Sequence, residues 1–211
     1  MRVLHVLDHS IPLHSGYTFR TRSILREQRA MGWETFHVTG SKQNSGSALE
    51  ETVDGLHFYR TPIADGLLGK LPVLNQKQVI DGLERRLAEI IPTVRPDVLH
   101  AHSPSLNAIA ALRAGKKFGI PVVYEVRAFW EDAAVDHGTA TENGLRYRLT
   151  RALESYALRR ADAVTTICEG LRRDIVARGI PADKITVIPN AVDIDKFAVG
   201  GVADQLSLIH I

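Results

Sequence analysis

The chain has 211 residues, of which 45% are hydrophobic and 24% are charged, and its formal net charge is +2. This length and composition supply enough apolar side chains for one α/β domain with a substantial core. A chain so close to neutral, with no concentrated basic stripe, is atypical of nucleic-acid-binding proteins, so we expect no nucleic-acid partner.

The only cysteine, Cys168, cannot form a disulfide framework or a cysteine-based zinc site. We interpret it as a small buried hydrophobe rather than a nucleophile. One cysteine favours a reducing compartment, and we predict a cytoplasmic location. The first apolar run ends at Asp8 and His9, which is too early for a signal peptide, and no apolar stretch approaches the roughly 18 residues that a membrane-spanning helix needs.

Runs of apolar and β-branched residues predict strands, and apolar residues three and four apart predict helices. In chain order we expect strands at 3–7, 36–39, 56–59, 98–101, 122–126, 163–167 and 185–188, and helices at 17–31, 79–90, 106–117, 142–160 and 169–178. The polar stretches 40–51 and 127–141 are predicted loops, and 64–72 is irregular. Strands that alternate with helices indicate a Rossmann-like, doubly wound, mostly parallel sheet.

Several local signals refine these elements. Pro92 is expected to lie in the turn before the strand at 98–101, and Ser103 with Pro104 to begin the next helix, with Ser103 as its cap. In the helix at 142–160, Leu145, Leu149, Leu153 and Tyr156 are predicted to form the buried face. Its arginines favour a solvated face; a second interpretation is contact with anionic lipid or with a diphosphate-bearing acceptor.

The end of the chain differs in character. Small and flexible residues follow Phe197, and the final apolar residues 206–211 belong to no complete element. We therefore divide the chain into a domain at 1–190 and a linker with the start of a further domain at 191–211. We expect the natural chain to continue, and residues 206–211 not to be a native terminus.

In open α/β sheets, ligands bind beyond the carboxyl ends of the strands, so the loops there are the first place to seek a site. The loop after the first strand contains Ser15, Gly16 and Tyr17. A glycine just before a helix lets a ligand approach the free N–H groups of that helix. The simpler interpretation is a tight turn, because neither a G-x-G-x-x-G nor a P-loop pattern is present.

Two further strand ends carry polar residues. Strand alternation places His100 and His102 on one side of their strand, either as hydrogen-bonded structural residues or with His102 touching a ligand. No further ligand has readable spacing, so no metal site is predicted. Glu125 lies in an apolar strand and needs a partner, and Arg127 is on the same strand face.

The loop after that strand continues with Phe129 and Trp130, followed by Glu131 and Asp132. Aromatic surface beside fixed polar groups is how many sites hold sugars, although packing of Trp130 on the domain's own core is the plainer alternative. From loop position alone, we predict that Arg127, Glu131 and Asp132 contact an acceptor.

Together these motifs resemble the GT-B glycosyltransferases of the GT4-like group. Three segments carry the resemblance: the His-x-His segment 97–104, Ser15-Gly16 in place of a Gly-Gly loop, and 187–193 in place of a Pro-Asn-Gly-Val-Asp signature between the domains, which includes Asn190. Segments 124–132 and 166–170 look closest to a bacterial subgroup associated with exopolysaccharide and exosortase-linked gene clusters. The resemblance covers residues 1 to about 197.

The resemblance implies an enzyme of two Rossmann-like domains that transfers a sugar from a nucleotide-sugar, with retention of configuration and without a metal ion or other cofactor. This half would take a glycan or lipid-linked acceptor of bacterial polysaccharide biosynthesis, with peripheral contact at the inner membrane face. Gly16 would line the cleft, and His102 would hydrogen-bond the transferred sugar as the catalytic residue.

The donor-site residues would lie in a C-terminal half that this sequence does not contain, so we expect the 211-residue chain alone to be inactive. Two alternatives stay open: a nucleotide-sugar epimerase of the same two-domain architecture, and a non-catalytic Rossmann-like binding module.

Overall fold

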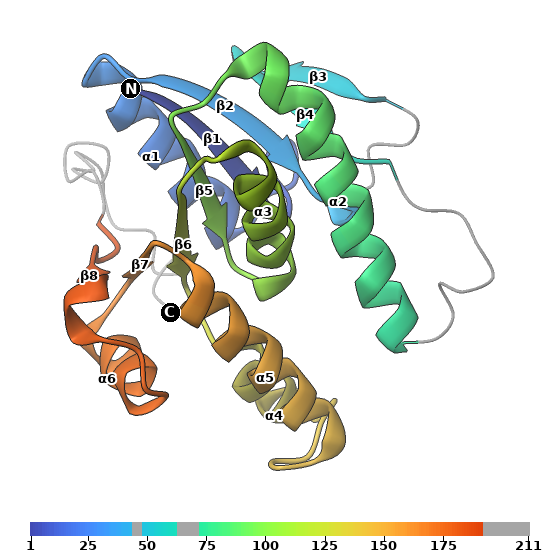
Figure 1. Cartoon of the computed structure of the whole chain (residues 1–211), viewed down its shortest axis with the longest axis vertical. Helices are drawn as coiled ribbons and strands as arrows, with labels where there is room; N and C mark the ends of the chain where they lie inside the picture. The colour runs from blue at the N-terminus through green and yellow to red at the C-terminus, as the bar shows by residue number, and fades with distance from the viewer. Residues whose placement is uncertain (44–47, 63–71, 192–211) are drawn as a thin grey trace, which may run out of the picture.

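The computed structural model describes residues 1–43, 48–62 and 72–191. Its strands form one sheet in the order β3-β4-β2-β1-β5-β6-β7-β8, in which only the β3–β4 pair is antiparallel. The strands are β1 (Arg2–Leu7), β2 (Glu34–Thr39), β3 (Glu50–Val53), β4 (Leu56–Arg60), β5 (Val98–His102), β6 (Val122–Val126), β7 (Ala163–Thr166) and β8 (Ile185–Val187). The predicted doubly wound, mostly parallel α/β fold is confirmed (Figure 1).

The helices connect these strands as parallel pairing requires. They are α1 (Gly16–Ala30), α2 (Pro72–Val94), α3 (Ser105–Phe118), α4 (Trp130–Asp136), α5 (Leu145–Arg160) and α6 (Glu169–Ala177), with short 3₁₀ turns at Ser41–Gln43 and Ala182–Lys184. Helices α2, α3 and α5 lie in front of the sheet in Figure 1, and α1 lies behind it. No helix in the described parts of the chain is both long and apolar enough to cross a bilayer.

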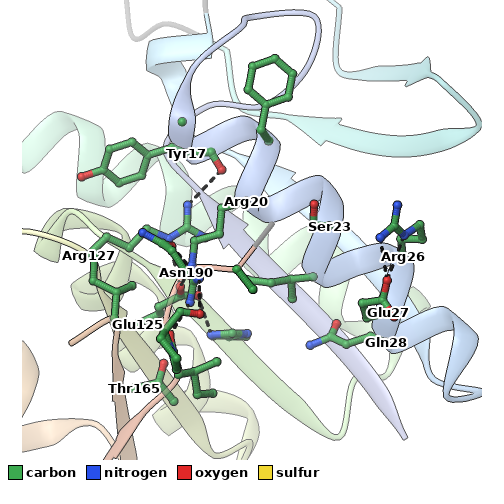
Figure 2. A pocket seen from close by; sticks show the side chains of 18 of the residues that line it. Tyr17, Arg20, Ser23, Arg26, Glu27, Gln28, Glu125, Arg127, Thr165 and Asn190 are labelled. Carbon is green, nitrogen blue, oxygen red and sulfur yellow. Dashed lines mark hydrogen bonds and ion pairs between the residues drawn. The ribbon is translucent and has the colours of Figure 1, made fainter. Parts of the chain in front are cut away.

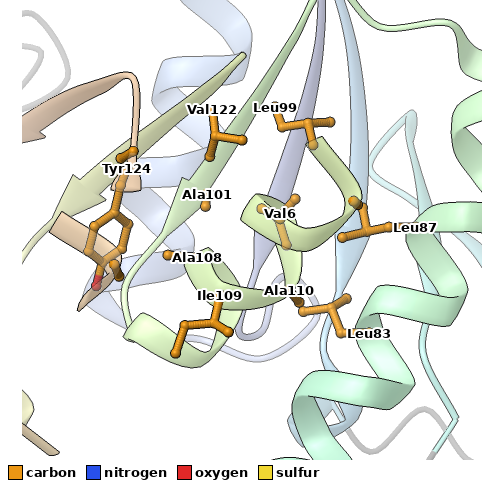
Figure 3. Packing of buried hydrophobic residues seen from close by; sticks show 14 of the residues in the cluster. Val6, Leu83, Leu87, Leu99, Ala101, Ala108, Ile109, Ala110, Val122 and Tyr124 are labelled. Atoms are coloured by element: carbon orange, nitrogen blue, oxygen red, sulfur yellow. The ribbon is translucent and has the colours of Figure 1, made fainter. Parts of the chain in front are cut away.

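The main core fills the space between the sheet and the front helices. Strand residues such as Val6, Leu99 and Ala101 pack there against Leu83 and Leu87 of α2 and against the alanines of α3 (Figure 3). A smaller cluster lies on the α1 side, where the fully buried Leu25 contacts apolar residues of β1 and β4 and of the loop after β1. Two apolar layers of unequal size therefore cover the two faces.

Strand alternation gives the α1 side of the central strands an unusual polar character. Leu99, Ala101 and Tyr124 point to the main core, whereas His100, His102 and Glu125 occupy the alternate positions of β5 and β6. His102 and Glu125 are each 2% exposed, so their polar atoms need partners inside the protein. The candidate site is built on this face.

Two predicted loops contain secondary structure. The stretch 40–51 includes the start of β3, which forms a hairpin with β4 through Asp54 and Gly55, both with positive φ. An Asp-Gly pair is a hairpin signal, and the prediction of 40–51 as a loop did not take it into account. The stretch 127–141 includes α4, whose Ala-rich centre supports a helix despite its polar ends.

Some predicted boundaries and faces are also wrong. Helix α2 continues past Pro92 to Val94, because Ile91 and Val94 are buried and hold its last turn. Helix α3 begins at Ser105, after Pro104, and Ser103 does not cap it. The Ser103 hydroxyl donates to the backbone carbonyl of Glu125 instead (2.9 Å).

Helix α5 presents to the core a face that matches the predicted one only at Leu153, which is partly buried and packs against the core. Leu145 is 77% exposed and Leu149 and Tyr156 are also exposed, whereas Glu154, Ala157 and Leu158 are buried. The helix turns inward a glutamate whose partner is the Tyr124 hydroxyl, at 2.7 Å. A search for apolar stripes cannot find that pairing. The five arginines of α5 are exposed, as a solvated face requires.

One further prediction is wrong, and three others concern segments that lie partly or wholly outside the described residues. Cys168 is exposed before α6 and is not a buried hydrophobe. The irregular stretch 64–72 falls almost wholly outside the described residues, as do the end of the interdomain segment and residues 206–211.

Gly115 offers a direct test of the α3–β6 packing. A Cβ added there would lie 2.6 Å from the Ile120 carbonyl oxygen and 2.7 Å from a methyl group of Val122. We predict that Gly115→Ala lowers the free energy of unfolding by about 2 kcal/mol, because the overlap outweighs the roughly 1 kcal/mol that alanine gains as a helix former.

Urea unfolding of Gly115→Ala beside Gly170→Ala measures this effect. Gly170 is also helical, and its added Cβ would have only an ordinary contact, at 3.7 Å from Cys168 Sγ. We expect Gly170→Ala to leave the free energy of unfolding equal or raised. Equal stability of the two variants would contradict this close packing of α3 against β6.

Candidate functional site

A groove of about 1240 Å³ runs along α1 on the polar side of the sheet. One wall is α1, from Gly16 to beyond Gln28, and the floor comes from β5, β6 and β7. The segment after β8, from Ile188 to Ala191, forms the opposite wall. Figure 2 shows side chains of α1 facing Glu125, Arg127 and Asn190 across this space.

Arg127 connects the elements at the head of the groove. Its Nη1 donates to the backbone oxygen of Tyr17 (3.0 Å), and its Nη2 lies 2.6 Å from Nδ1 of His102. The guanidinium also lies 5.3 Å from the centre of the Tyr17 ring. Gly16 and Arg127 both line the groove, and His102 lies one layer beneath them. The structure thus brings together the three strand ends that the sequence singled out.

Glu125 is the acceptor at the centre of this arrangement. Its Oε1 accepts from Nε of Arg20 (2.8 Å) and from Nε of Arg127 (3.1 Å), and its Oε2 lies 3.2 Å from Nδ1 of His102. Burial alone raises the pKa of this carboxyl, but the charged and polar groups around it, Arg127 among them, more than offset burial and hold the pKa well below its usual range. The carboxylate is therefore ionised and compensated, and the predicted Glu125–Arg127 pair is present.

A directed chain of hydrogen bonds crosses the buried histidines. Because Arg127 can only donate, Nδ1 of His102 accepts, and the proton of His102 lies on Nε2. That proton is shared with Nδ1 of His5 at 3.0 Å, and Nε2 of His5 then donates to Oε1 of Gln28 at 2.8 Å. Burial, with neighbouring His100 next, lowers the pKa of both His5 and His102 well below the ordinary value, so both rings are neutral.

These hydrogen bonds limit what His102 can do, both as a sugar contact and as a metal ligand. Both ring nitrogens are engaged and the residue does not line the groove, so a contact with a transferred sugar requires Arg127 to move; that catalytic role stays a prediction. His5, His100 and His102 also have ligand atoms within 4.8 Å of one another, as a metal site would. Here the His102 proton lies between two of these rings and a fixed cation lies at 2.6 Å, so the donor set does not fit a cation.

Arg20 joins α1 to the segment that leads out of the domain. Its guanidinium donates to the backbone oxygens of Ile188 (3.0 Å) and Pro189 (3.3 Å) and to Oδ1 of Asn190 (2.8 Å), while its Nε holds Glu125. Asn190 was predicted as an interdomain residue, and the structure places it at the groove wall.

The start of α1 leaves backbone donors at the mouth of the groove. Ser15 caps the helix by accepting from the Thr18 N–H (3.1 Å), and the first intrahelical bond runs from Phe19 to the Ser15 carbonyl (3.1 Å). Helix geometry then leaves the N–H groups of Gly16 and Tyr17 to point beyond the helix start. A Cβ on Gly16 would meet nothing within 4 Å, so space is open there.

The structure does not bring Glu131 and Asp132 to the groove. Glu131 is fully buried in α4, with Oε1 2.7 Å from Nη1 of Arg178, which lies on the main-core side. Asp132 accepts from the Tyr147 hydroxyl at 3.0 Å. Trp130, next to them, is 36% exposed, contacts Lys42 and Tyr17 at the strand ends, and is not packed in the core.

Sequence reasoning missed Arg20, Gln28 and His5, although all three belong to the site. Arg20 and Gln28 are ordinary polar positions on a helix, so the sequence does not mark them. His5 could have been predicted as a site residue, because a histidine inside an apolar strand needs a buried partner just as Glu125 does.

The chain belongs to the glycosyl transferase 4-like domain family, whose model matches residues 15–191. No curated protein matches it closely enough to count as a relative. The sucrose-phosphate synthase of Thermosynechococcus elongatus has the same fold with a TM-score of 0.67 and 13% identity, covering 92% of this chain and 49% of that one.

Other structures with this fold belong to a different enzyme class. The UDP-GlcNAc 2-epimerase of Methanocaldococcus jannaschii, in complex with UDP-GlcNAc and UDP, gives a TM-score of 0.59 at 13% identity, covering 90% of this chain and 47% of that one. That of Neisseria meningitidis, bound to UDP-GlcNAc, gives 0.57 at 16% identity, with 89% and 46% covered. The chain thus spans about half the length of these proteins.

The buried histidines predict a loss of stability in mild acid. Burial lowers the pKa of His37 from 6.5 to about 4, and its Nδ1 donates to the His57 carbonyl at 2.8 Å. Below pH 6.5 the unfolded chain therefore binds more protons than the folded one, and stability falls until about pH 4. We expect each such histidine to cost up to about 1.4 kcal/mol per pH unit in this window.

Urea unfolding between pH 7.5 and 4.5 checks this, with His37→Gln beside the wild type. The variant keeps a donor for the His57 carbonyl but does not titrate, so its free energy of unfolding should fall less steeply. Identical slopes for the two proteins would rule out His37 as a source of the acid sensitivity.

Glu154 lowers the stability of the protein at high pH, whereas the buried histidines lower it at low pH. Burial, partly offset by the Tyr124 hydrogen bond and reinforced by Glu131, raises its pKa from 4.5 to about 7. The folded state keeps this proton up to pH 7, whereas the unfolded state loses it above 4.5, so ionisation costs stability at higher pH. We predict that Glu154→Gln stabilises the protein at pH 8 by about 2–3 kcal/mol.

The gain should fade to nothing by about pH 4.5, where both states of the wild type are protonated. Thermal unfolding of Glu154→Gln at pH 8 and pH 4.5 measures it, with the exposed Glu169→Gln as control. A destabilised Glu154→Gln at pH 8 would show that the carboxylate is satisfied in place.

Proposed function

We propose that this chain is the acceptor-side half of a retaining glycosyltransferase that moves a sugar from a nucleotide-sugar to a glycan or lipid-linked acceptor of bacterial polysaccharide synthesis. The observation that carries the proposal is the open space at Gly16, where free N–H groups of α1 meet the groove beside Arg127. The family assignment supports a transferase, and the exopolysaccharide context is part of the proposal.

The head of the groove has the chemistry that a departing diphosphate requires. The N–H groups at the start of a 15-residue helix and its dipole favour negative charge there. Arg20 and Arg127 add two positive charges against the one carboxylate of Glu125, so this side of the site has a net positive charge. Stabilising the charge that develops on the leaving group lowers the barrier without a metal ion or other cofactor.

The acceptor would lie against the aromatic surface nearby. Tyr17 and Phe19 line the groove, and Phe19 is 51% exposed, so a sugar ring or a lipid-linked acceptor finds apolar surface beside polar groups. In this proposal the protein acts in the cytoplasm, at the inner face of the membrane. The donor would be held by a further domain.

A nucleotide-sugar epimerase is the second candidate, because several structures with this fold are UDP-GlcNAc 2-epimerases. The two functions differ in a measurable way. Epimerisation at C2 breaks the C2–H bond and needs no acceptor, whereas transfer needs an acceptor and leaves C2 untouched.

The natural gene product, incubated with a panel of nucleotide-sugars in D₂O, separates these functions. We expect acceptor-dependent product with the donor's anomeric configuration and no deuterium at C2. Deuterium at C2 without acceptor would establish the epimerase instead, and turnover of neither kind would favour a binding module. We expect no turnover from the 211-residue chain by itself; transfer by that chain would contradict the proposed division of the site.

Gly16→Val tests the location of the site. The added side chain meets no protein atom within 4 Å at Cβ, so the free energy of unfolding should change by less than about 0.5 kcal/mol. It would occupy the space proposed for the substrate, and we expect kcat/KM of the natural enzyme to fall on the order of 100-fold. Gly170→Ala is the matched control, and unchanged turnover in Gly16→Val would place the chemistry elsewhere.

A further inference from the structure

Three side chains beside the start of α1 form a chain of contacts that the proposed transferase does not use. The hydroxyl oxygen of Ser15 lies 2.7 Å from Nε2 of His9, and Nδ1 of His9 lies 3.3 Å from Oδ2 of Asp8. All three residues are partly exposed. A hydroxyl, an imidazole and a carboxylate in this order are the elements of an activated nucleophile.

The directions of the hydrogen bonds agree with that order. Ser15 Oγ already accepts the Thr18 N–H at 3.1 Å and lies 3.1 Å from the Thr18 hydroxyl. Its own proton is therefore available for His9 Nε2, and His9 then donates its Nδ1 proton to Asp8. Lys42, 3.1 Å from the other oxygen of Asp8, helps to hold that carboxylate ionised and in place.

The same helix start provides donors for a developing negative charge. The N–H groups of Gly16 and Tyr17 follow Ser15 directly and precede the first intrahelical bond, which Phe19 makes to the Ser15 carbonyl. An oxygen that becomes negative next to Ser15 Oγ would lie near these two donors, at the positive end of the helix dipole.

We propose that Ser15 is a serine nucleophile, activated by His9 and Asp8, that takes acyl groups from small activated esters. Ser15 Oγ forms a bond to the acyl carbon while its proton moves to His9 Nε2. The tetrahedral oxyanion then collapses, the bond to the leaving alcohol breaks, and His9 returns the proton to that alcohol. Water, with His9 again as base, releases the acid and restores the Ser15 hydroxyl.

A fluorophosphonate probe tests this site on the 211-residue chain. Ser15 Oγ would displace fluoride from phosphorus, and the expected result is one covalent adduct on Ser15, located by peptide mass spectrometry. Hydrolysis of p-nitrophenyl acetate should show the same dependence on Ser15. Neither reaction needs a nucleotide-sugar or a further domain, so a negative result here leaves the transferase proposal untouched.

The variants separate chemistry from folding. Ser15→Asn keeps a side chain able to cap α1 but has no hydroxyl, so it should fold and lose the adduct completely. His9→Gln should slow labelling by at least 100-fold and Asp8→Asn by about 10-fold or more. Ser155→Ala, which removes a hydroxyl from α5 far from this cluster, should label like the wild type.

The outcomes are decisive when circular dichroism shows each protein folded. Absence of an adduct on wild-type Ser15 would overturn the proposal, as would an adduct that forms at the same rate in His9→Gln.

A thiol in place of the Ser15 hydroxyl adds a second measurement. Ser15→Cys should be alkylated by iodoacetamide at pH 6.5 at least 10-fold faster than exposed Cys168, and the difference should vanish when His9→Gln is added.

Discussion

The carboxylate of Glu125 is the interaction on which the organisation of this domain depends. It is 2% exposed on the less covered side of the sheet, and an unpaired charge there would be costly. Its hydrogen-bonding partners come from two separate parts of the chain, Arg20 from α1 and Arg127 from the end of β6, and Nδ1 of His102 in β5 lies 3.2 Å from its other oxygen. The ion pair between Arg20 and this carboxylate therefore holds α1 over the central strands.

That constraint also sets the shape of the groove. Arg20 uses its remaining donors on the carbonyls after β8 and on Asn190, so the two walls of the groove are attached to the same residue. Arg127 in turn holds the backbone at Tyr17, which fixes the direction in which the first N–H groups of α1 point. The groove is thus a consequence of how a buried charge is compensated.

The sequence predicted those features that depend on local periodicity and failed on those that depend on distant partners. Alternation along β5 placed His100 and His102 together, and the same rule paired Glu125 with Arg127; the rings of the two histidines lie 4.4 Å apart. Glu131 was predicted to contact an acceptor because nothing near it in sequence shows that it would be buried beside Arg178, in the connection after α6.

The buried face of α5 was predicted mostly wrongly for the same reason, because Glu154 turns inward to the Tyr124 hydroxyl, 30 residues away. The sequence did not indicate a special role for Arg20, which lies in a helix with many polar residues. Arg20 nevertheless donates to carbonyls 168 and 169 positions further along the chain. A buried polar side chain is positioned by its partner. Where that partner is distant in sequence, the sequence alone does not show which face or site the side chain occupies.

The start of α1 is the point where the two proposed chemistries meet. Gly16 and Tyr17 offer two free N–H groups, and the Ser15 hydroxyl that would use them lies directly before them. A diphosphate bound to these donors would take the place of any oxyanion formed at Ser15, and an acylated Ser15 would crowd the open space at Gly16. The two reactions would compete for one pair of backbone groups, which Arg127 and, through it, Glu125 hold in position.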